Sequence, residues 1–377
     1  MAVQGEGQVT TTRVRTRATL ATSIIAVTVL LGASGLPGAA RAASGPSTAR
    51  FPWGTFTLNS RIAAKVAAHQ PLNAIVSFQA LGVPFAVPEM NAGMKRAANA
   101  AKTQYGATIN TKVVGPVNTD PNAQISQIRT LINSGQVDCL AIEPTTPDAF
   151  ADIFDVAFKA GVPVFAVNTD APKAHRFSYY GIDEVAGGKV VGRNTITWLT
   201  RRHITPKAVA LFTGDTTAPW AQGRMTGWLD VMKAAYPHLK VYGTPTTAPS
   251  DNYEGTVTYS KVRAVLTGRP DVNLLFHTDW GIQYMPQTIS DLKLTNKVFA
   301  VGYNVDDAIL NEVQNGSIIG TLDQRYDNQS AGFVQGCANY LYAHKLPSYP
   351  VSYVSPFMVT HDNVVAYRKL FHLLIKG

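Results

Sequence analysis

Short runs of apolar residues alternate along the chain with segments whose apolar positions recur every three or four residues. The runs LNAIVSF at 72–78 and VPVFAV at 162–167 are apolar almost throughout, a pattern typical of strands buried on both faces of a parallel sheet. After the first run, Met90, Met94 and Ala97 fall on one stripe of a helix. The repeated alternation of buried strands and amphipathic helices predicts a doubly wound α/β fold.

The alternation continues along the chain and carries local start and stop signals. A helix begins at Asp120-Pro121, where a capping residue precedes a proline, and it ends near Gly135. About ten strands are expected, which is too many for one sheet, so we expect two Rossmann-like α/β lobes. We place the first lobe at 72–181 plus 325–353, the second at 182–324 plus 354–377, and an N-terminal extension with a short helix at 43–71.

Residues 1–42 have the pattern of a secretory signal peptide. Arg13, Arg15 and Arg17 precede the apolar run ATLATSIIAVTVLLGASGL, and ARA at 40–42 provides small residues for cleavage. An uncleaved membrane anchor is the alternative, and the glycine and proline near the end of the run argue against it. We expect an exported protein, either periplasmic or secreted from a single-membrane cell. Because no cysteine stands at the cleavage site, a lipoprotein is not expected.

The composition is that of a globular protein, with 46% hydrophobic and 15% charged residues. Residues 1–42 carry four arginines and one glutamate, so their removal lowers the formal net charge from +9 to +6. No long block of lysine and arginine remains in the sequence. Nucleic-acid binding is therefore not supported.

The two cysteines, Cys139 and Cys337, lie in an apolar strand and in a helical pattern. Export permits a disulfide, but both patterns predict burial, and we expect two separate buried thiols. The eight histidines show no paired spacing that would bind zinc. We expect neither a metal nor another cofactor.

The buried run VPVFAV ends abruptly in three polar residues, Asn168, Thr169 and Asp170. In open parallel sheets, ligands bind beyond the carboxyl ends of the strands. Side chains at and beside these ends therefore form a candidate ligand-binding set. Its polar members are Gln79, Asn168, Thr169, Asp170, Thr278, Asp279, Asn304 and Gln324, and its aromatic members are Phe78, Phe85, Trp220, Trp280 and Tyr303. Amides and carboxylates bind neighbouring hydroxyls and aromatic rings pack against C–H faces, so the set fits a small, neutral, hydroxyl-rich ligand.

Structural roles compete with ligand binding for several of these residues. Asp170 and Asp279 have the sequence context of helix or turn caps, and Phe78 and Tyr303 fit a hydrophobic core. The two tryptophans fit either role. For the amides, ligand binding is favoured, because an amide at the end of a buried strand needs hydrogen-bond partners.

Enzyme motifs are absent from the sequence. The glycines of EVAGGKVVG at 184–192 lack the spacing of a dinucleotide-binding loop. No G-x-x-x-x-G-K-[ST], H-E-x-x-H or G-x-S-x-G motif occurs. The sequence therefore predicts a binding protein and not an enzyme.

Several segments of the chain stand in the order of one known family's landmarks. They are LGVPFAVPEMNAGMKRAA, DPNAQISQIRTLINSGQVDCLAIEPTTPDAF, YYGIDEVAGGKVVGRNTITWL, AQGRMTGW, LLFHTDW, VFAVGYNVDDAI and GTLDQRYDNQSAGF. The series resembles type I periplasmic binding proteins of the ribose- and galactose-binding kind, which are solute receptors of ABC importers related to LacI-type ligand domains. The resemblance spans residues 72–376.

This resemblance implies two lobes joined by a three-strand hinge, with the ligand held between them. Hinge closure then creates the surface that a membrane permease recognises, and we expect a monomer. Matched position by position, ligand contacts fall at Gln79, Val83, Phe85, Asn168, Thr169, Gln222, Thr278, Asn304 and Gln324. A sensory or autoinducer-type receptor on the same fold is the alternative. A LacI-type repressor would begin with a helix-turn-helix where this chain has its signal-peptide pattern.

The chain departs from the family pattern by exchanging charged groups for neutral ones. Asn168-Thr169 stands in place of an Asp-Arg pair, Gln222 in place of an arginine and Asn304 in place of an aspartate. The first-lobe motif at 83–86 also lacks one amide and one ring. Charge-assisted hydrogen bonds are about twice as strong as neutral ones, so ribose is disfavoured and a sugar alcohol or deoxy sugar fits better.

The replacement Asn168→Ala is expected to weaken ligand binding by about 1–3 kcal/mol, because it leaves a buried polar partner without its hydrogen bond. Calorimetric titration of wild type and variant checks this. Equal affinities would contradict the assignment of Asn168 to the ligand.

Overall fold

The computed structural model describes residues 48–83 and 85–376. Contacts divide the chain into two units, Met1–Arg41 and Ala42–Gly377, and all the helices and strands given below belong to the second unit. The expected signal peptide and the first five residues of the expected extension lie outside the described residues.

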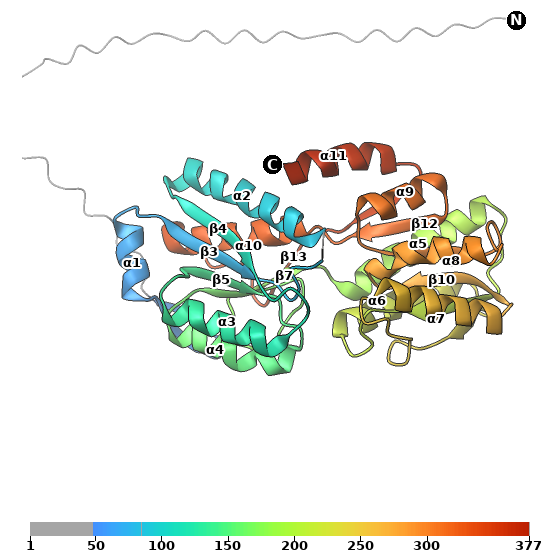
Figure 1. Cartoon of the computed structure of the whole chain (residues 1–377). Coiled ribbons are helices and arrows are strands. Elements are labelled where there is room, and N and C mark those ends of the chain that lie inside the picture. Colours follow the sequence, from blue (N-terminus) through green and yellow to red (C-terminus); the bar gives the residue numbers. More distant parts are fainter. Residues whose placement is uncertain (1–47, 84, 377) are drawn as a thin grey trace, which may run out of the picture. The chain divides into compact units, whose positions relative to one another are not determined.

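Six parallel strands form the sheet of the first lobe, in the order β13-β7-β6-β5-β3-β4. The strands are β3 (Leu72–Ser77), β4 (Ile109–Val114), β5 (Cys139–Ile142), β6 (Val164–Val167), β7 (Tyr179–Gly181) and β13 (Val351–Tyr353). The helices are α2 (Ala86–Tyr105), α3 (Pro121–Asn133), the short η1 (Pro147–Phe150), α4 (Ala151–Lys159) and α10 (Tyr326–Ala343). Figure 1 shows α3 and α4 together on one face of this sheet and α2 and α10 on the other.

The second lobe has a six-stranded sheet in the order β14-β12-β11-β10-β8-β9, parallel except for the β12–β14 pair. Its strands are β8 (Ala208–Phe212), β9 (Lys240–Tyr242), β10 (Val272–His277), β11 (Phe299–Tyr303), β12 (Ile318–Asp323) and β14 (Phe357–Thr360). Its helices are α5 (Glu184–Arg201), α6 (Pro219–Ala235), α7 (Gly255–Gly268), the short η2 (Trp280–Tyr284), α8 (Met285–Asp291), α9 (Asp307–Asn315) and α11 (Val364–Lys376).

Strand β8 explains why the core strands are apolar without alternation. Ala208, Ala210 and Phe212 pack into the core beneath α7, α8 and α9, whereas Val209 and Leu211 pack into the core beneath α5 and α6. Successive side chains of a strand point to opposite faces. Since both faces of the sheet are covered by helices, every position of the strand has to be apolar.

The chain passes between the two sheets three times. It leaves the first sheet after β7, returns to it after β12 through α10, and leaves it again between β13 and β14. The expected doubly wound α/β fold with two lobes and a three-strand hinge is confirmed. The residue boundaries of the lobes stay predictions.

A short hairpin precedes the first lobe. It consists of β1 (Thr48–Phe51) and β2 (Gly54–Thr57), and the expected short helix α1 (Ser60–Ala67) follows. The side chain of Phe56 is fully buried, with its ring centroid 4.9 Å from that of Phe177. The hairpin thus extends the core of the first lobe. The sequence did not predict it, because its four-residue strands mix polar and apolar positions without a clear period.

The expectation of two separate thiols is wrong. Cys139 on β5 and Cys337 on α10 are both buried, but they form a disulfide with a Cα–Cα distance of 6.4 Å. The two residues are 198 positions apart, and they meet because α10 returns to cover the sheet after the chain has built the second lobe. This long-range packing leaves no local signal in the sequence.

Within residues 48–83 and 85–376, no helix combines the length and apolar character that a membrane span requires.

Removal of the disulfide is expected to lower the free energy of unfolding by about 2–4 kcal/mol, because the crosslink restricts the unfolded chain. Urea denaturation of wild type with and without reductant measures the difference. The double variant Cys139→Ala/Cys337→Ala serves as control and should not respond to reductant. Equal stability of the oxidised and reduced wild type would contradict a stabilising crosslink.

Candidate functional site

A cavity of about 460 Å³ lies between the carboxyl ends of the two sheets. Both lobes contribute to its wall, which combines aromatic rings with amides. The first-lobe side is formed by Phe78, Gln79, Ala80, Gly82, Val83, Phe85, Val117, Asn118, Thr119 and Asn168, and the second-lobe and hinge side by Trp220, Arg224, Asn252, Tyr253, Glu254, Asp279, Trp280, Asn304, Gln324 and Tyr326. The site therefore occupies the place at which ligands bind to open parallel sheets.

Most of the predicted site residues meet in this cavity. Gln79, Phe85, Asn168, Trp220, Asp279, Trp280, Asn304 and Gln324 all line it. Phe78 and Val83 line it as well, so Phe78 is both core and cavity wall. Tyr303 is fully buried behind the wall.

Four predicted site residues do not line the cavity and need a different interpretation. Asp170 forms two hydrogen bonds of 2.7 Å with the guanidinium of Arg176, and the Gln222 amide donates to the carbonyl of Thr216. The hydroxyl of Thr278 is buried beneath the wall and donates to Thr213 at 2.7 Å. Thr169 is buried as well. The side chains of Asp170, Gln222 and Thr278 thus form hydrogen bonds within the protein, and a ligand-binding role for the four residues stays a prediction.

Two asparagines end core strands in the same unusual backbone conformation. Asn168 follows β6 with φ 57°, and Asn304 follows β11 with φ 74°. Asparagine adopts this left-handed conformation more readily than most residues because its short side chain hydrogen-bonds locally. Each strand thus turns sharply while its amide stays at the cavity wall.

On the first-lobe side, two amides converge on one carboxylate. The Nδ2 atom of Asn168 and the Nε2 atom of Gln79 donate to Oε1 of Glu143 at 2.5 and 3.2 Å. Glu143 follows β5 and is fully buried. Burial raises its pKa to about 7, while a side-chain hydrogen bond from Asn168 and a backbone hydrogen bond from Gln79 lower it. Within the described chain, Glu143 Oε2 and Asn168 Oδ1 are buried atoms without a hydrogen-bond partner.

On the second-lobe side, the buried guanidinium of Arg224 organises the wall. It donates to both carboxylate oxygens of Glu184 at 2.6 and 3.0 Å, to the carbonyl of Thr278 at 2.8 Å and to Oε1 of Gln324 at 2.5 Å. Burial lowers the pKa of Arg224, but the charge and the hydrogen bonds of Glu184, together with Tyr303 and Tyr326, outweigh it and raise the pKa overall. Gln324 in turn donates a hydrogen bond from its amide N–H to Asn304 Oδ1, so Arg224 is linked to Asn304 through Gln324.

Aromatic rings flank the guanidinium. The Trp220 and Tyr303 rings lie 4.6 and 4.5 Å from the Arg224 carbon Cζ, within cation–π range. Trp280 is held in place by a 2.8 Å hydrogen bond from its Nε1 to Asp306, the N-cap of α9. The rings at the wall are thereby fixed before any ligand arrives.

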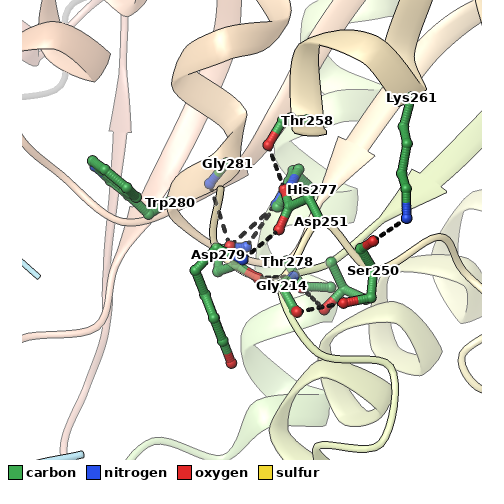
Figure 2. Close-up of polar contacts among 12 residues, drawn as sticks. Gly214, Ser250, Asp251, Thr258, Lys261, His277, Thr278, Asp279, Trp280 and Gly281 are labelled. Atoms are coloured by element: carbon green, nitrogen blue, oxygen red, sulfur yellow. Dashed lines mark hydrogen bonds and ion pairs between the residues drawn. The ribbon is translucent and has the colours of Figure 1, made fainter. Parts of the chain in front are cut away.

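A buried polar cluster supports the second-lobe wall. Figure 2 shows Asp251, His277 and Asp279 gathered together, with Trp280 turned away from them. His277 Nε2 lies 2.8 Å from Asp251 Oδ2, while Asp279 accepts the backbone N–H of Gly214 at 2.7 Å. Burial lowers the pKa of His277, but the charges of Asp279 and Asp251 outweigh it and raise the pKa overall. The cluster ties the segments after β8 and β10 to the segment before α7.

The same three residues have ligand atoms within 4.8 Å of one another, as a metal site requires. These atoms already serve as hydrogen-bond partners of one another and of neighbouring groups, Thr258 and the Gly281 amide among them. A Cβ atom placed on Gly281 would lie 2.2 Å from His277 Nε2, so the backbone fits closely against the ring. We interpret the cluster as structural, because its hydrogen bonds hold neighbouring segments of the second lobe together.

Several cavity residues were missed by the sequence analysis. Asn118 and Thr119 come shortly after β4, so the expectation that ligands bind beyond strand ends could have included them. Tyr253 lies in an irregular segment before α7, with φ 62°, and its ring fits over Gly214, where a Cβ would lie 2.3 Å from the ring. No period or motif marks that position.

The charges at the wall are largely compensated. Arg224 is paired with Glu184, and Asp279 accepts backbone N–H groups. The Asn168 and Asn304 amides and the Trp220 ring are among the groups offered to a ligand, and the exposed carboxylate of Glu254 also lines the cavity. This arrangement is suited to neutral hydroxyl groups and C–H faces.

Comparison with known proteins identifies the family. Residues 74–344 match the family described as periplasmic binding protein domain, and the chain belongs to that family. The xylose/arabinose-binding protein of Sulfolobus acidocaldarius is 24% identical over 268 residues, which cover 64% of this chain. The match spans 62% of that relative's length.

Solved structures show the same fold. The glucose-galactose binding protein GanP of Geobacillus stearothermophilus has a TM-score of 0.66 at 18% identity, covering 78% of this chain and 99% of its own. An ABC transporter solute-binding protein of Burkholderia graminis in complex with D-arabinose has a TM-score of 0.68 at 22% identity, covering 78% and 97%. An ABC transporter periplasmic solute-binding protein of Actinobacillus succinogenes with bound D-allose has a TM-score of 0.66 at 22% identity, covering 79% of this chain and 100% of its own.

Replacement of Arg224 by leucine is expected to lower the free energy of unfolding by about 3–5 kcal/mol, because the buried Glu184 loses its counter-charge. Urea denaturation measures the loss. Arg201→Leu is the matched control, since Arg201 pairs with Asp362 on the exposed surface and such pairs contribute less than about 1 kcal/mol. Similar losses in both variants would contradict the organising role of Arg224.

Proposed function

We propose that this member of the periplasmic binding protein family is the exported substrate-binding protein of an ABC importer. It captures a small neutral polyhydroxy compound, a sugar alcohol or sugar, in the cavity between the lobes and presents it to the permease. The observation that carries the proposal is the pair of strand-end amides, Asn168 and Asn304, that line the cavity from the two lobes together with fixed aromatic rings.

Hydrogen bonding at the cavity favours hydroxyl ligands. A hydroxyl both donates and accepts a hydrogen bond, and a carboxamide offers both partners. Asn168 Oδ1 is a buried acceptor without a partner among the described residues, and burying an acceptor unsatisfied costs about 1–3 kcal/mol. A ligand hydroxyl that donates to it removes this cost.

The size and the lining of the cavity also fit a monosaccharide-sized molecule. Ligand pockets usually measure about 300–1,000 Å³, and this cavity measures about 460 Å³. Trp220, Trp280 and Phe85 provide flat apolar surface for the C–H faces of a sugar or polyol. Arg224 forms an ion pair with Glu184. Because its charge is already compensated, the site favours a neutral ligand over an anion.

In the proposed mechanism, the three chain crossings between the lobes act as a hinge that closes on the ligand. Closure of a hinge around a ligand brings both walls onto it and changes the outer surface that a partner recognises. The sugars in the names of the similar proteins support capture of a sugar-like ligand. The description of two of the similar solved structures as ABC transporter proteins supports uptake over sensing. No catalytic step belongs to this proposal, and the protein acts as a monomer released from its signal peptide.

A thermal-shift screen of the mature chain from Ala43 tests the proposal, with pentoses, hexoses, deoxy sugars, four- to six-carbon polyols and inositols as ligands. A ligand at a hundred times its dissociation constant adds about 2.7 kcal/mol of stability. We expect a clear rise in melting temperature with one polyol or sugar class.

The same ligand should lose its effect on the Asn304→Ala variant and keep it on Asn315→Ala, which removes an amide of α9 that does not line the cavity. A flat response across the panel would contradict the proposed ligand class. Chemical turnover of a bound compound would contradict a pure binding function.

A further inference from the structure

Glu143 occupies an unusual position behind the first-lobe wall. Its carboxylate is fully buried and is not part of the cavity lining, yet two first-lobe amides that line the cavity, those of Gln79 and Asn168, donate to it. The two N–H groups share one oxygen, Oε1, and Oε2 has no partner among the described residues. A second carboxylate oxygen thus stays buried and uncompensated beside the candidate ligand site.

A carboxylate fixes the direction of an amide that contacts it. An ionised carboxylate only accepts hydrogen bonds, so the N–H side of each amide must face Glu143. The carbonyl lies on the opposite branch of the amide group. With Asn168 and Gln79 both turned in this way, their carbonyl oxygens are directed away from Glu143, and both residues line the cavity.

Protonation of Glu143 removes this constraint. A neutral carboxylic acid has an O–H donor as well as an acceptor, and the oxygen that is free to carry the proton is Oε2. An amide beside it can then turn its carbonyl toward the acid and its NH₂ group toward the cavity. The first-lobe wall would change from two acceptors to one acceptor and one donor.

We propose that Glu143 is a positioning residue that sets the hydrogen-bonding polarity of the first-lobe wall: its carboxylate form presents two carbonyl acceptors to ligand hydroxyls, and its protonated form weakens ligand binding. This inference rests on the proposed function for its ligand. It assigns the selectivity of the site to a side chain that acts through Gln79 and Asn168 and does not touch the ligand.

The environment of Glu143 places the change near neutral pH. Burial raises its pKa to about 7, while hydrogen bonds from Asn168 and Gln79 and the charge of Arg224 lower it. Arg224 is the charged group that acts on it from the second lobe, and Tyr253 and Tyr326 lie within electrostatic range. The affinity for a hydroxyl ligand should therefore fall as the pH falls through about 7, and ligand binding near that pH should release protons.

The variant Glu143→Gln imitates the protonated state. Glutamine has the same shape and, like the neutral acid, one acceptor and a donor. Its affinity should be about five- to tenfold below that of wild type at high pH, which corresponds to one hydrogen bond of about 1–1.5 kcal/mol. Below the pKa of Glu143, wild type should approach the affinity of the variant.

Calorimetric titration with the best ligand of the panel, from about pH 5.5 to about pH 8.5 and in buffers of different ionisation enthalpy, provides the test. Wild type should show the fall in affinity through about pH 7 and the proton release, and Glu143→Gln should lack this contribution. Other groups of raised pKa, such as His277 and Asp323, affect both proteins and cancel in the comparison. Glu312→Gln on α9 is the matched control and should behave as wild type.

A second measurement needs no ligand and separates this inference from the proposed function. The side-chain NH₂ signals of Asn168 and Gln79, assigned through the Asn168→Asp and Gln79→Glu variants, are followed by ¹⁵N–¹H NMR during a pH titration. In wild type they should shift with a common midpoint near pH 7, and in Glu143→Gln they should not shift.

The outcomes are distinct. If no compound of the panel binds but the amide signals titrate with Glu143, the proposed function fails and the positioning role stands. If a ligand binds with an affinity that is independent of pH, or if Glu143→Gln keeps the pH dependence of wild type, the inference is overturned and the proposed function remains.

Discussion

The buried guanidinium of Arg224 is the interaction on which the second-lobe wall depends. One planar group joins α6 to α5 through Glu184, to the end of β10 through the Thr278 carbonyl, and to the end of β12 through Gln324. Leaving any of these partners unpaired would bury a charge or a polar group without compensation, which costs several kcal/mol. The geometry is therefore strongly determined: Gln324 is fixed, it orients Asn304, and the Trp220 ring is held against the guanidinium.

The two walls of the cavity use different electrostatic means to orient neutral amides. On the second lobe, a fully paired cation supplies hydrogen bonds to the carbonyl of Gln324. On the first lobe, the buried carboxylate of Glu143 attracts the N–H groups of Gln79 and Asn168. A ligand between the walls meets oriented dipoles and aromatic rings instead of bare charges. Such a surface is preorganised for hydroxyl groups, because little reorganisation is needed when the lobes close.

The fold could be predicted from the sequence because its signals are local. Apolar strands such as β8 report burial on both faces, and Asp120 caps α3 as expected. The residues expected at and beside the strand ends make up nine of the twenty residues of the cavity wall, for the same reason. The features that the sequence did not predict depend on packing between distant segments: the Cys139–Cys337 disulfide and the ring of Tyr253 over Gly214. Each of these contacts is decided by where the folded chain returns, which no short pattern records.

The decisive measurement is a crystal structure of the complex with the best-binding polyol or sugar. We expect ligand hydroxyls within hydrogen-bond distance of Asn168 on one wall and of Asn304 on the other, with an aromatic ring of the cavity against a C–H face of the ligand. A ligand bound outside the cavity, or one that contacts the amides of a single lobe only, would contradict it.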